Sequence, residues 1–182
     1  MARKNFGAKP FTYPQPVFII AAYGENDIPS AMNAAWGGIS DYKEITMDLS
    51  KGHKTVQDLR ARGAFTVSMG TLPQLVACDY VGVVSGNKED KSGAFAWTTG
   101  ENGAPLIDAA KVSIELSVEA NHETEGFDNF FCKILATYAE ESVLNDQGKL
   151  DYHVFKPVLF EFPTYEYFVT GDCVGACARM NG

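Results

Sequence analysis

A ten-residue stretch near the middle of the chain constrains the fold more than any other feature. In Lys111–Ala120, KVSIELSVEA, apolar and polar side chains alternate without interruption. A period of two is typical of a β-strand that buries one face and exposes the other. The chain must therefore supply neighbouring strands on both sides of this segment and an apolar layer against its buried face.

Other short apolar runs, bounded by turn-forming residues, predict those neighbours. The expected strands are Val17–Tyr23, Ala31–Trp36, Glu44–Leu49, Ala64–Met69, Phe130–Tyr138, Val158–Phe162 and Tyr165–Phe168. Gly37 and Gly38, with the polar SDYK after them, are expected to separate two of these strands. Many closely spaced strands predict a mainly β, antiparallel barrel or sandwich rather than a parallel sheet.

Two segments read as helices. Thr55–Arg62 carries Val56 and Leu59 three residues apart, and Gly63 follows in the position that often ends a helix. A second helix is expected after Thr71, which with Gln74 has the spacing of a capping box. Its apolar face would hold Leu75, Cys78 and Val81–Val84.

Composition narrows the class of protein. The 182 residues suffice for one core, so we expect one domain over residues 1–182. With 23 acidic against 15 basic side chains, the net charge of −8 argues against nucleic acid as a partner. No apolar run is long enough to cross a bilayer, and no apolar segment follows the basic N-terminus as in a signal peptide. Four scattered cysteines do not form a secreted disulfide framework, so we expect a cytoplasmic location.

The stretch SKGHKTVQDLRARGAF, residues 50–65, gathers cations in this acidic chain. Lys51, His53 and Lys54 come immediately before the first predicted helix, and Thr55 can cap it. A helix N-terminus presents unpaired N–H groups and a positive dipole end, which together favour an anion. The alternative is a capped helix whose lysines lie in water, and this turn alone does not exclude it.

Two further segments are compatible with a ligand site. SAMNAAWGGIS, residues 30–40, places small residues around Asn33 and Trp36, so that a flat ligand can lie against the backbone. VSGNKEDKSG, residues 84–93, follows the second predicted helix and carries Ser85, Gly86 and Lys91. Taken singly, residues 30–40 are equally consistent with a tightly packed strand, and residues 84–93 with a solvated loop.

In this order the segments resemble the flavin reductase-like family of FMN-binding split barrels, and its flavoredoxin-like members in particular. The resemblance begins with the strand after Pro16 and continues through the Asn-Ala-Ala strand, LSKGHKT and DYVGVVSGNKEDK. It then includes GAPLIDAAKVSIEL and ends at YFVTGDCVGA, which is similar to a recurring Tyr-x-x-x-Gly-x-x-x-Gly ending. The resemblance implies a six-stranded antiparallel Greek-key split barrel with a few short flanking helices.

The resemblance also implies roles for particular residues. Asn33, Ala34, Ala35 and Trp36 would lie along the isoalloxazine of FMN, and Leu49 would line the same pocket. Ser50 would reach the ribityl chain or the phosphate. The phosphate-binding turn would comprise Lys51, His53, Lys54 and Thr55. Ser85, Gly86 and Lys91 would approach the flavin from the other side, with Asp90 as the partner of Lys91. Members of the family are homodimers with FMN near the subunit interface.

The implied function is an FMN-dependent oxidoreductase that takes electrons from NAD(P)H or a redox protein. The alternatives are a flavoredoxin-type carrier without small-molecule turnover, and a ligand-binding barrel without flavin. Because the flavin carries the redox chemistry, we name no catalytic residue. Cys173 and Cys177 lack the spacing of a zinc site or a Cys-x-x-Cys motif, so we predict no metal. We expect Cys78 in the core, His122 exposed in a turn, and His153 at an edge or near the pocket. Trp97 would lie over the flavin or fill the barrel mouth.

Overall fold

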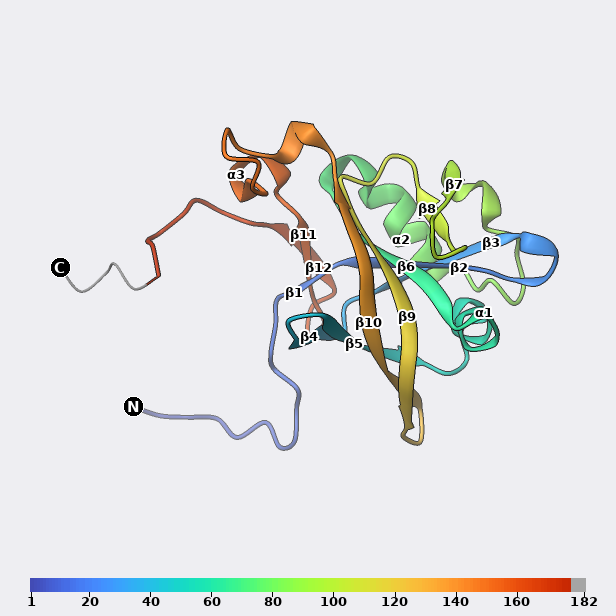
Figure 1. Cartoon of the computed structure of the whole chain (residues 1–182). Helices are drawn as coiled ribbons and strands as arrows, with labels where there is room; N and C mark the ends of the chain where they lie inside the picture. The colour runs from blue at the N-terminus through green and yellow to red at the C-terminus, as the bar shows by residue number, and fades with distance from the viewer. Residues whose placement is uncertain (178–182) are drawn as a thin grey trace.

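The computed structural model describes residues 1–177, and all of its strand pairings are antiparallel. A seven-stranded sheet in the order β3-β2-β6-β9-β10-β5-β4 forms the body of the molecule (Figure 1). A three-stranded sheet, β1-β11-β12, and a two-stranded sheet, β7-β8, lie beside it. The expectation of a mainly β, antiparallel protein is therefore confirmed.

The strands of the seven-stranded sheet are β2 (Phe18–Tyr23), β3 (Pro29–Ala34), β4 (Gly37–Asp41), β5 (Glu44–Ser50), β6 (Ala64–Met69), β9 (Val112–Glu123) and β10 (Phe127–Ala139). The small sheets contain β1 (Gln15–Pro16), β11 (Val158–Glu161) and β12 (Glu166–Val169), and β7 (Trp97–Thr99) and β8 (Pro105–Ile107). The α-helices are α1 (Lys54–Arg62), α2 (Leu75–Val83) and α3 (Tyr152–Phe155). Single 3₁₀ turns are η1 (Glu25–Asp27), η2 (Leu72–Gln74), η3 (Ser92–Ala94) and η4 (Glu141–Val143).

The large sheet coils around one apolar core without closing. Met32 from β3, near one edge, packs in the same buried cluster as Met47 and Leu49 from β5, near the other. Leu116 of β9 and Phe130 of β10 lie in this cluster too, so the alternating segment buries its apolar face as predicted. The prediction of six strands was wrong, because β4 adds a seventh at the edge and the barrel remains open.

The additional strand begins with the two glycines that were expected to separate two strands. Gly37 pairs with Met47 and Gly38 with Thr46. A Cβ atom at Gly37 would come within 2.6 Å of the Thr46 carbonyl oxygen and 2.9 Å of the Met47 sulfur. Glycine thus permits a close backbone approach here instead of breaking the strand.

Helices α1 and α2 pack on opposite faces of the sheet at β2 and β3. Val56 and Leu59 of α1 are fully buried in the main core, and Gly63 ends α1 in the left-handed conformation, as predicted. Cys78 and Val81 of α2 pack on the other face of the sheet, against Ile19 and Ala21. Because β2 is covered on both faces, its sequence is an unbroken apolar run rather than an alternating one.

Two capping predictions were wrong. His53, and not Thr55, occupies the N-cap position of α1, because the helix begins one residue earlier than expected. Thr71 Oγ1 donates to Gln74 Oε1 at 2.9 Å, so the two side chains bond each other and not the backbone of a helix end. Between residues 1 and 177, no helix is long and apolar enough to span a membrane.

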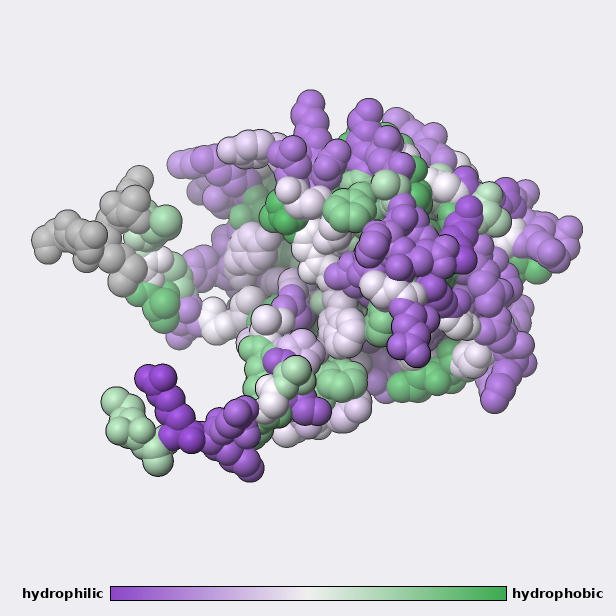
Figure 2. Space-filling model, turned by 90° about the horizontal axis from the view of Figure 1, so that it is seen from below, coloured by the Kyte–Doolittle hydropathy of each residue, from purple (hydrophilic) through white to green (hydrophobic). Residues whose placement is uncertain are grey.

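Residues 1–14 and 170–177 extend from the same side of the body, near β1, β11 and β12 (Figure 1). Seen from below, hydrophilic side chains cover the opposite end, whereas hydrophobic and intermediate ones gather between that end and the termini (Figure 2).

Candidate functional site

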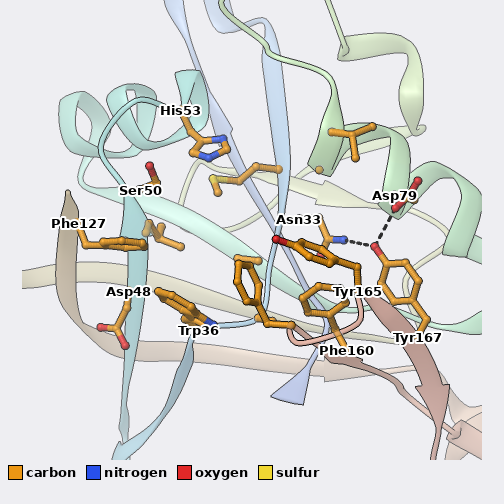
Figure 3. Close-up of a pocket in the computed structure, with 17 residues that line it drawn as sticks. Asn33, Trp36, Asp48, Ser50, His53, Asp79, Phe127, Phe160, Tyr165 and Tyr167 are labelled. Atoms are coloured by element: carbon orange, nitrogen blue, oxygen red, sulfur yellow. Dashed lines mark hydrogen bonds between the residues drawn. The ribbon is translucent and has the colours of Figure 1, made fainter. Parts of the chain in front are cut away.

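A cavity of about 470 Å³ opens between β3, β5, the end of α2 and the β11–β12 hairpin (Figure 3). The residues that line it are Met32, Asn33, Ala34, Ala35, Trp36, Asp48, Leu49, Ser50, His53, Asp79, Gly82, Val83, Phe127, Phe160, Phe162, Tyr165 and Tyr167. Its volume lies in the range of cavities that hold small ligands and cofactors. The ends of distant strands therefore meet at a ligand-sized space.

Aromatic rings form two walls of the cavity. Trp36 and Phe127 stack with ring centroids 5.1 Å apart and an interplanar angle of 26°. From the hairpin, Phe162 and Tyr165 lie 4.9 Å apart, and Phe160 lies 5.4 Å from Tyr167. The rings leave a slot suited to a planar, largely apolar group.

Small residues keep a third wall thin. Ala34 and Ala35 present little more than backbone on the β3 side. Opposite them, a Cβ atom at Gly82 of α2 would meet the Asn33 Cβ at 2.8 Å. Only glycine at position 82 lets the helix approach the strand this closely, and this contact fixes one side of Asn33.

A hydrogen-bonded chain fixes the other side of Asn33. Its Nδ2 donates to the Tyr167 hydroxyl at 3.3 Å, and that hydroxyl donates to Asp79 Oδ1 at 2.9 Å (Figure 3). Burial, followed by the neighbouring Asp79 carboxylate, raises the pKa of Tyr167 to about 12. The phenol therefore stays protonated. Because the side-chain nitrogen of Asn33 bonds Tyr167, the side-chain oxygen of Asn33 is the acceptor that remains for a ligand.

A smaller compartment of about 170 Å³ continues from this cavity to the N-terminus of α1. The two spaces share Ser50, His53, Gly82 and Val83. The smaller one is also lined by Gly52, Lys54, Thr55, Val84, Ser85, Gly86 and Lys91. The first amides of α1 point out of the helix here and favour an anion. An aromatic slot is thus joined to a polar, cationic end.

Two basic side chains at this end are partly withdrawn from water. Lys91 is 6% exposed, and its Nζ donates to the Val81 carbonyl at 2.7 Å. Burial lowers the pKa of Lys91. Burial, and then the charge of Lys91, lowers the pKa of His53. Both pKa shifts show that burial disfavours positive charge at this end of the site, and a bound phosphate would offset that effect.

The loop after α2 differs from expectation in one contact. Asp90 does not pair with Lys91, because its Oδ1 accepts the Ser92 amide at 2.8 Å while Lys91 turns inward to α2. The hydrogen bond from the Ser92 amide lowers the pKa of Asp90. Lys91 lines the compartment, and its hydrogen-bond partner there is the Val81 carbonyl of α2 and not a carboxylate.

The remaining lysines of the cationic turn point in different directions. Lys51 Nζ lies 2.9 Å from Glu123 Oε2 on β9, and Lys51 does not line either compartment. Lys54 lines the smaller compartment, but its Nζ lies 2.5 Å from Asp58 Oδ1. Thr55 is 1% exposed, and its hydroxyl bonds the Ser30 hydroxyl at 2.8 Å. All of the predicted site residues except Lys51 therefore line the two compartments.

The sequence did not identify ten of the residues that line the cavity, and all of them except Met32 come from outside the three predicted segments. Asp48 is one of them: it lies on β5 facing the cavity, and burial raises its pKa. The others are Met32, Asp79, Gly82, Val83, Phe127, Phe160, Phe162, Tyr165 and Tyr167. For Asp48 and Ser50 the signal was available, because alternate residues of a strand share a face. The aromatic residues have no local signal, since only the fold brings them to the slot.

Other candidates lie away from the site. Trp97 belongs to β7, and its Nε1 donates to the Ser92 carbonyl at 2.7 Å, so it fills space under α2 instead of covering the cavity. Cys78 is buried and His122 exposed, as predicted, although His122 lies within β9 and not in a turn. His153 is exposed on α3 and does not line the cavity. Cys173 and Cys177 are exposed, unbridged thiols.

Comparisons with known proteins agree with this geometry. The family model described as flavin reductase like domain matches residues 11–165. Comparison with curated proteins gives no match.

Two similar solved structures are flavoredoxins. The flavoredoxin of Methanosarcina acetivorans has a TM-score of 0.92 and 28% identity, with 99% of this chain and 97% of that chain covered. The flavoredoxin of Desulfovibrio vulgaris (Miyazaki F) has a TM-score of 0.90 and 30% identity, with 100% of each chain covered. An FMN-binding protein from Thermus thermophilus with bound 1-cyclohex-2-enone is similar in fold, with a TM-score of 0.81 and 20% identity over 97% of this chain and 99% of that chain.

Proposed function

Because the chain belongs to the flavin reductase-like domain family, we propose that it is an FMN-binding oxidoreductase. It would move electrons from a reduced donor, NAD(P)H in the first instance, through bound FMN to a flavin, small-molecule or protein acceptor. The observation that carries this proposal is the continuous space from an aromatic slot to a cationic end at α1. Its two halves match the planar ring and the phosphate of FMN.

The residues present fit this cofactor. The slot offers Asn33 and the backbone of Ala34 and Ala35 to the ring, with Trp36 and Leu49 beside them. Ser50 lines both compartments, where the ribityl chain would pass. The phosphate would meet His53, Lys54, Thr55, Ser85, Gly86, Lys91 and the first amides of α1. Because Lys51 is bonded to Glu123, it would act on the phosphate only through its more distant charge.

Bound FMN would supply the electron transfer itself, and the protein would bind, orient and shield it. The side-chain amide oxygen of Asn33, held in place by Tyr167, can accept a hydrogen bond from an N–H group of the ring. The buried charge of Lys91 favours a phosphate or a ring that carries negative charge. We assign no residue to acid–base catalysis.

An absorbance spectrum tests the proposal directly. Purified protein, with and without added FMN, is expected to show the shifted visible bands of a bound flavin. Under anaerobic conditions, NADH or NADPH is expected to bleach those bands within the mixing time of a manual experiment. Protein that neither carries nor binds FMN would refute the proposed function.

A flavoredoxin-type electron carrier is the second candidate, and the two flavoredoxin structures at 28% and 30% identity favour it. A carrier would keep its FMN and exchange electrons with redox proteins without turning over a small molecule. The same anaerobic experiment separates the candidates. Flavin that stays oxidised with both pyridine nucleotides, and is reduced by dithionite, would identify the carrier.

We further propose a homodimer with FMN near the subunit interface and, from the cysteine content, a cytoplasmic location. Nucleic acid is not expected as a partner, because the chain has a net charge of −8. A membrane is not expected as a partner, because no apolar run is long enough to cross a bilayer. These points rest on the sequence and on the family.

A further inference from the structure

Helix α2 carries a single charged side chain, and that side chain lines the cavity without a cation beside it. Asp79 is the only charged residue of α2, and it belongs to the lining of the 470 Å³ cavity. None of the ion pairs within residues 1–177 includes it. Its Oδ1 accepts instead from the Tyr167 hydroxyl of β12 at 2.9 Å. The carboxylate therefore acts on the cavity through a neutral phenol.

The carboxylate fixes the order of donors and acceptors along this chain of side chains. A carboxylate can only accept, so the one hydroxyl hydrogen of Tyr167 is directed to Asp79 (Figure 3). The phenol oxygen can then only accept from Asn33, whose Nδ2 lies 3.3 Å away. The side-chain nitrogen of Asn33 is thereby committed to Tyr167, and its side-chain oxygen is left for a ligand. Asp79 thus decides which end of the Asn33 amide a ligand meets.

Two features keep the amide in this arrangement. Hydrogen bonds to a charged acceptor are roughly twice as strong as neutral ones, and a reversed chain would give up the bond to Asp79. The backbone of α2 also lies against Asn33, since a Cβ atom at Gly82 would lie 2.8 Å from Asn33 Cβ and 3.4 Å from Asn33 Nδ2. Asp79 and Gly82 are three residues apart and share one face of the helix. One face of α2 therefore supplies both the charge and the surface that holds the amide.

We propose that Asp79 is a positioning residue, which acts through Tyr167 to make the Asn33 amide present an oxygen, and not an NH2 group, to the flavin ring. This inference rests on the proposed FMN function and adds a role for Asp79 to it. The partial negative charge of the amide oxygen disfavours the additional electrons of a reduced ring, whereas an NH2 group would favour them. Asp79 therefore holds the potential of bound FMN low and makes the reduced flavin a stronger electron donor.

A purely structural role of the same chain predicts a different result. If the chain only held the β11–β12 hairpin against α2, Asp79→Asn would preserve it, because an amide oxygen also accepts from a phenol. If Asp79 sets the polarity, Asp79→Asn allows the chain to reverse. The new amide then donates to Tyr167, Tyr167 donates to Asn33 Oδ1, and Asn33 Nδ2 is left for the ring.

The test compares the affinities for oxidised and reduced FMN, whose ratio an anaerobic redox titration against a reference dye measures. Asp79→Asn is expected to shift this ratio toward reduced FMN by about tenfold, which raises the two-electron potential by about 30 mV. In a Tyr167→Phe background no hydroxyl connects position 79 to Asn33. There, Asp79→Asn is expected to shift the ratio by less than about threefold, which is the effect of the lost charge alone.

Glu166→Gln is the matched control. Glu166 precedes Tyr167 on β12, is exposed, and does not line the cavity. The substitution removes one negative charge, as Asp79→Asn does, and it keeps an oxygen for the Thr164 hydroxyl, which donates to Glu166 Oε2 at 2.9 Å. The ratio is expected to change by less than about threefold. A shift as large as that of Asp79→Asn would trace the effect to charge alone and overturn the inference.

The failures of the two proposals are distinguishable. Equal shifts from Asp79→Asn with and without the Tyr167 hydroxyl would reduce Asp79 to a nearby charge, and would overturn the inference while the flavin function stands. A ratio that Asp79→Asn does not change would also overturn it, and would leave the chain a purely structural role. Wild-type protein that binds neither oxidised nor reduced FMN would overturn the proposed function, and the inference about Asp79 with it.

Discussion

The Tyr167 hydroxyl joins the C-terminal hairpin to the strand that lines the slot. It accepts from Asn33 and donates to Asp79, so its removal leaves both partners unbonded. Tyr167→Phe is therefore expected to weaken FMN binding by roughly five- to tenfold, which is the effect of about 1–1.5 kcal/mol for one hydrogen bond. Flavin fluorescence titration measures the change.

Tyr165→Phe is the control for this prediction. Tyr165 lines the same slot, but its hydroxyl makes no hydrogen bond within residues 1–177, so the substitution removes an oxygen atom without breaking a chain. We expect its FMN affinity to remain near that of the wild type. Equal losses in the two variants would show that the effect comes from the aromatic lining and not from the position of Asn33.

His53 should make FMN binding depend on pH. Burial and the charge of Lys91 lower its pKa below the ordinary 6.5, so the imidazole is neutral at pH 7 in the free protein. A phosphate dianion would raise that pKa, and binding would then take up a proton. FMN affinity is therefore expected to fall as pH rises through the interval between the free and bound pKa values of His53.

The comparison variant for this experiment is His53→Asn, titrated with FMN between about pH 5.5 and 8. The phosphate of FMN ionises with a pKa of about 6, and this contribution is the same in both proteins. The difference between the two pH profiles thus isolates His53. Parallel profiles would mean that the imidazole does not contact the phosphate.

The amino-acid sequence predicts the chemical type of individual site residues better than the direction in which their side chains point. The cationic turn before α1 was identifiable from residue types alone, and His53, Lys54 and Thr55 do line the smaller compartment. Which lysine faces the compartment depends on carboxylates elsewhere. Glu123 holds Lys51 from β9, and Asp58 holds Lys54 from the next turn of α1. Such competition is decided by tertiary contacts that a local pattern does not contain.

At the scale of elements, the pairing of β4 with β5 requires glycine at position 37 but not at the adjacent position 38. Gly37→Ala places a methyl group 2.6 Å from the Thr46 carbonyl, whereas an added Cβ at Gly38 meets no atom within 4 Å. We expect Gly37→Ala to lower the free energy of unfolding by about 1–3 kcal/mol through overpacking. Gly38→Ala should be neutral or stabilise by up to about 1 kcal/mol through the unfolded state. Urea denaturation of both variants measures the difference, and equal stabilities would show that β4 does not pack as described.

The length and the burial pattern of a strand explain why some strands were predicted from the sequence and others were missed. Strands β6, β9 and β10 were predictable, since each carries a pattern of buried side chains longer than a turn. Strand β4 has no such pattern, because two of its five residues are glycines and the other three are exposed. β7 and β8 have three residues each, too few for any period to be visible. Their strand geometry comes from the surfaces on which they pack.

At the scale of the whole molecule, the site is assembled from the two ends of the chain. β3, β5 and α2 supply the strand wall, the polar turn and the helix end, all within the first 85 residues. The aromatic lining at Phe160, Tyr165 and Tyr167 comes from a hairpin more than 70 residues later. A sequence can indicate the first half through its motifs, but the second half is recruited only by the folded sheet.

The outer edge of this hairpin leads to a prediction about assembly. Phe162 and Tyr165 line the cavity and yet are 44% and 67% exposed, and Val83 at the end of α2 is 74% exposed. Apolar side chains that rim a ligand cavity are suited to burial by a second subunit. We expect light scattering after size exclusion to give twice the chain mass of 19.8 kDa.

Tyr165→Glu is expected to weaken both the dimer and FMN binding, because the new charge would lie at the proposed interface and beside the ring. Tyr152→Glu changes another exposed tyrosine, which is 55% exposed on α3 and lies outside the cavity, and it should leave both unchanged. The two readouts separate the possibilities. A dimer that persists in Tyr165→Glu while FMN binding falls would place the interface elsewhere. A monomer that binds FMN as tightly as the dimer would show that one chain builds the whole site, and that the exposed rim has another partner.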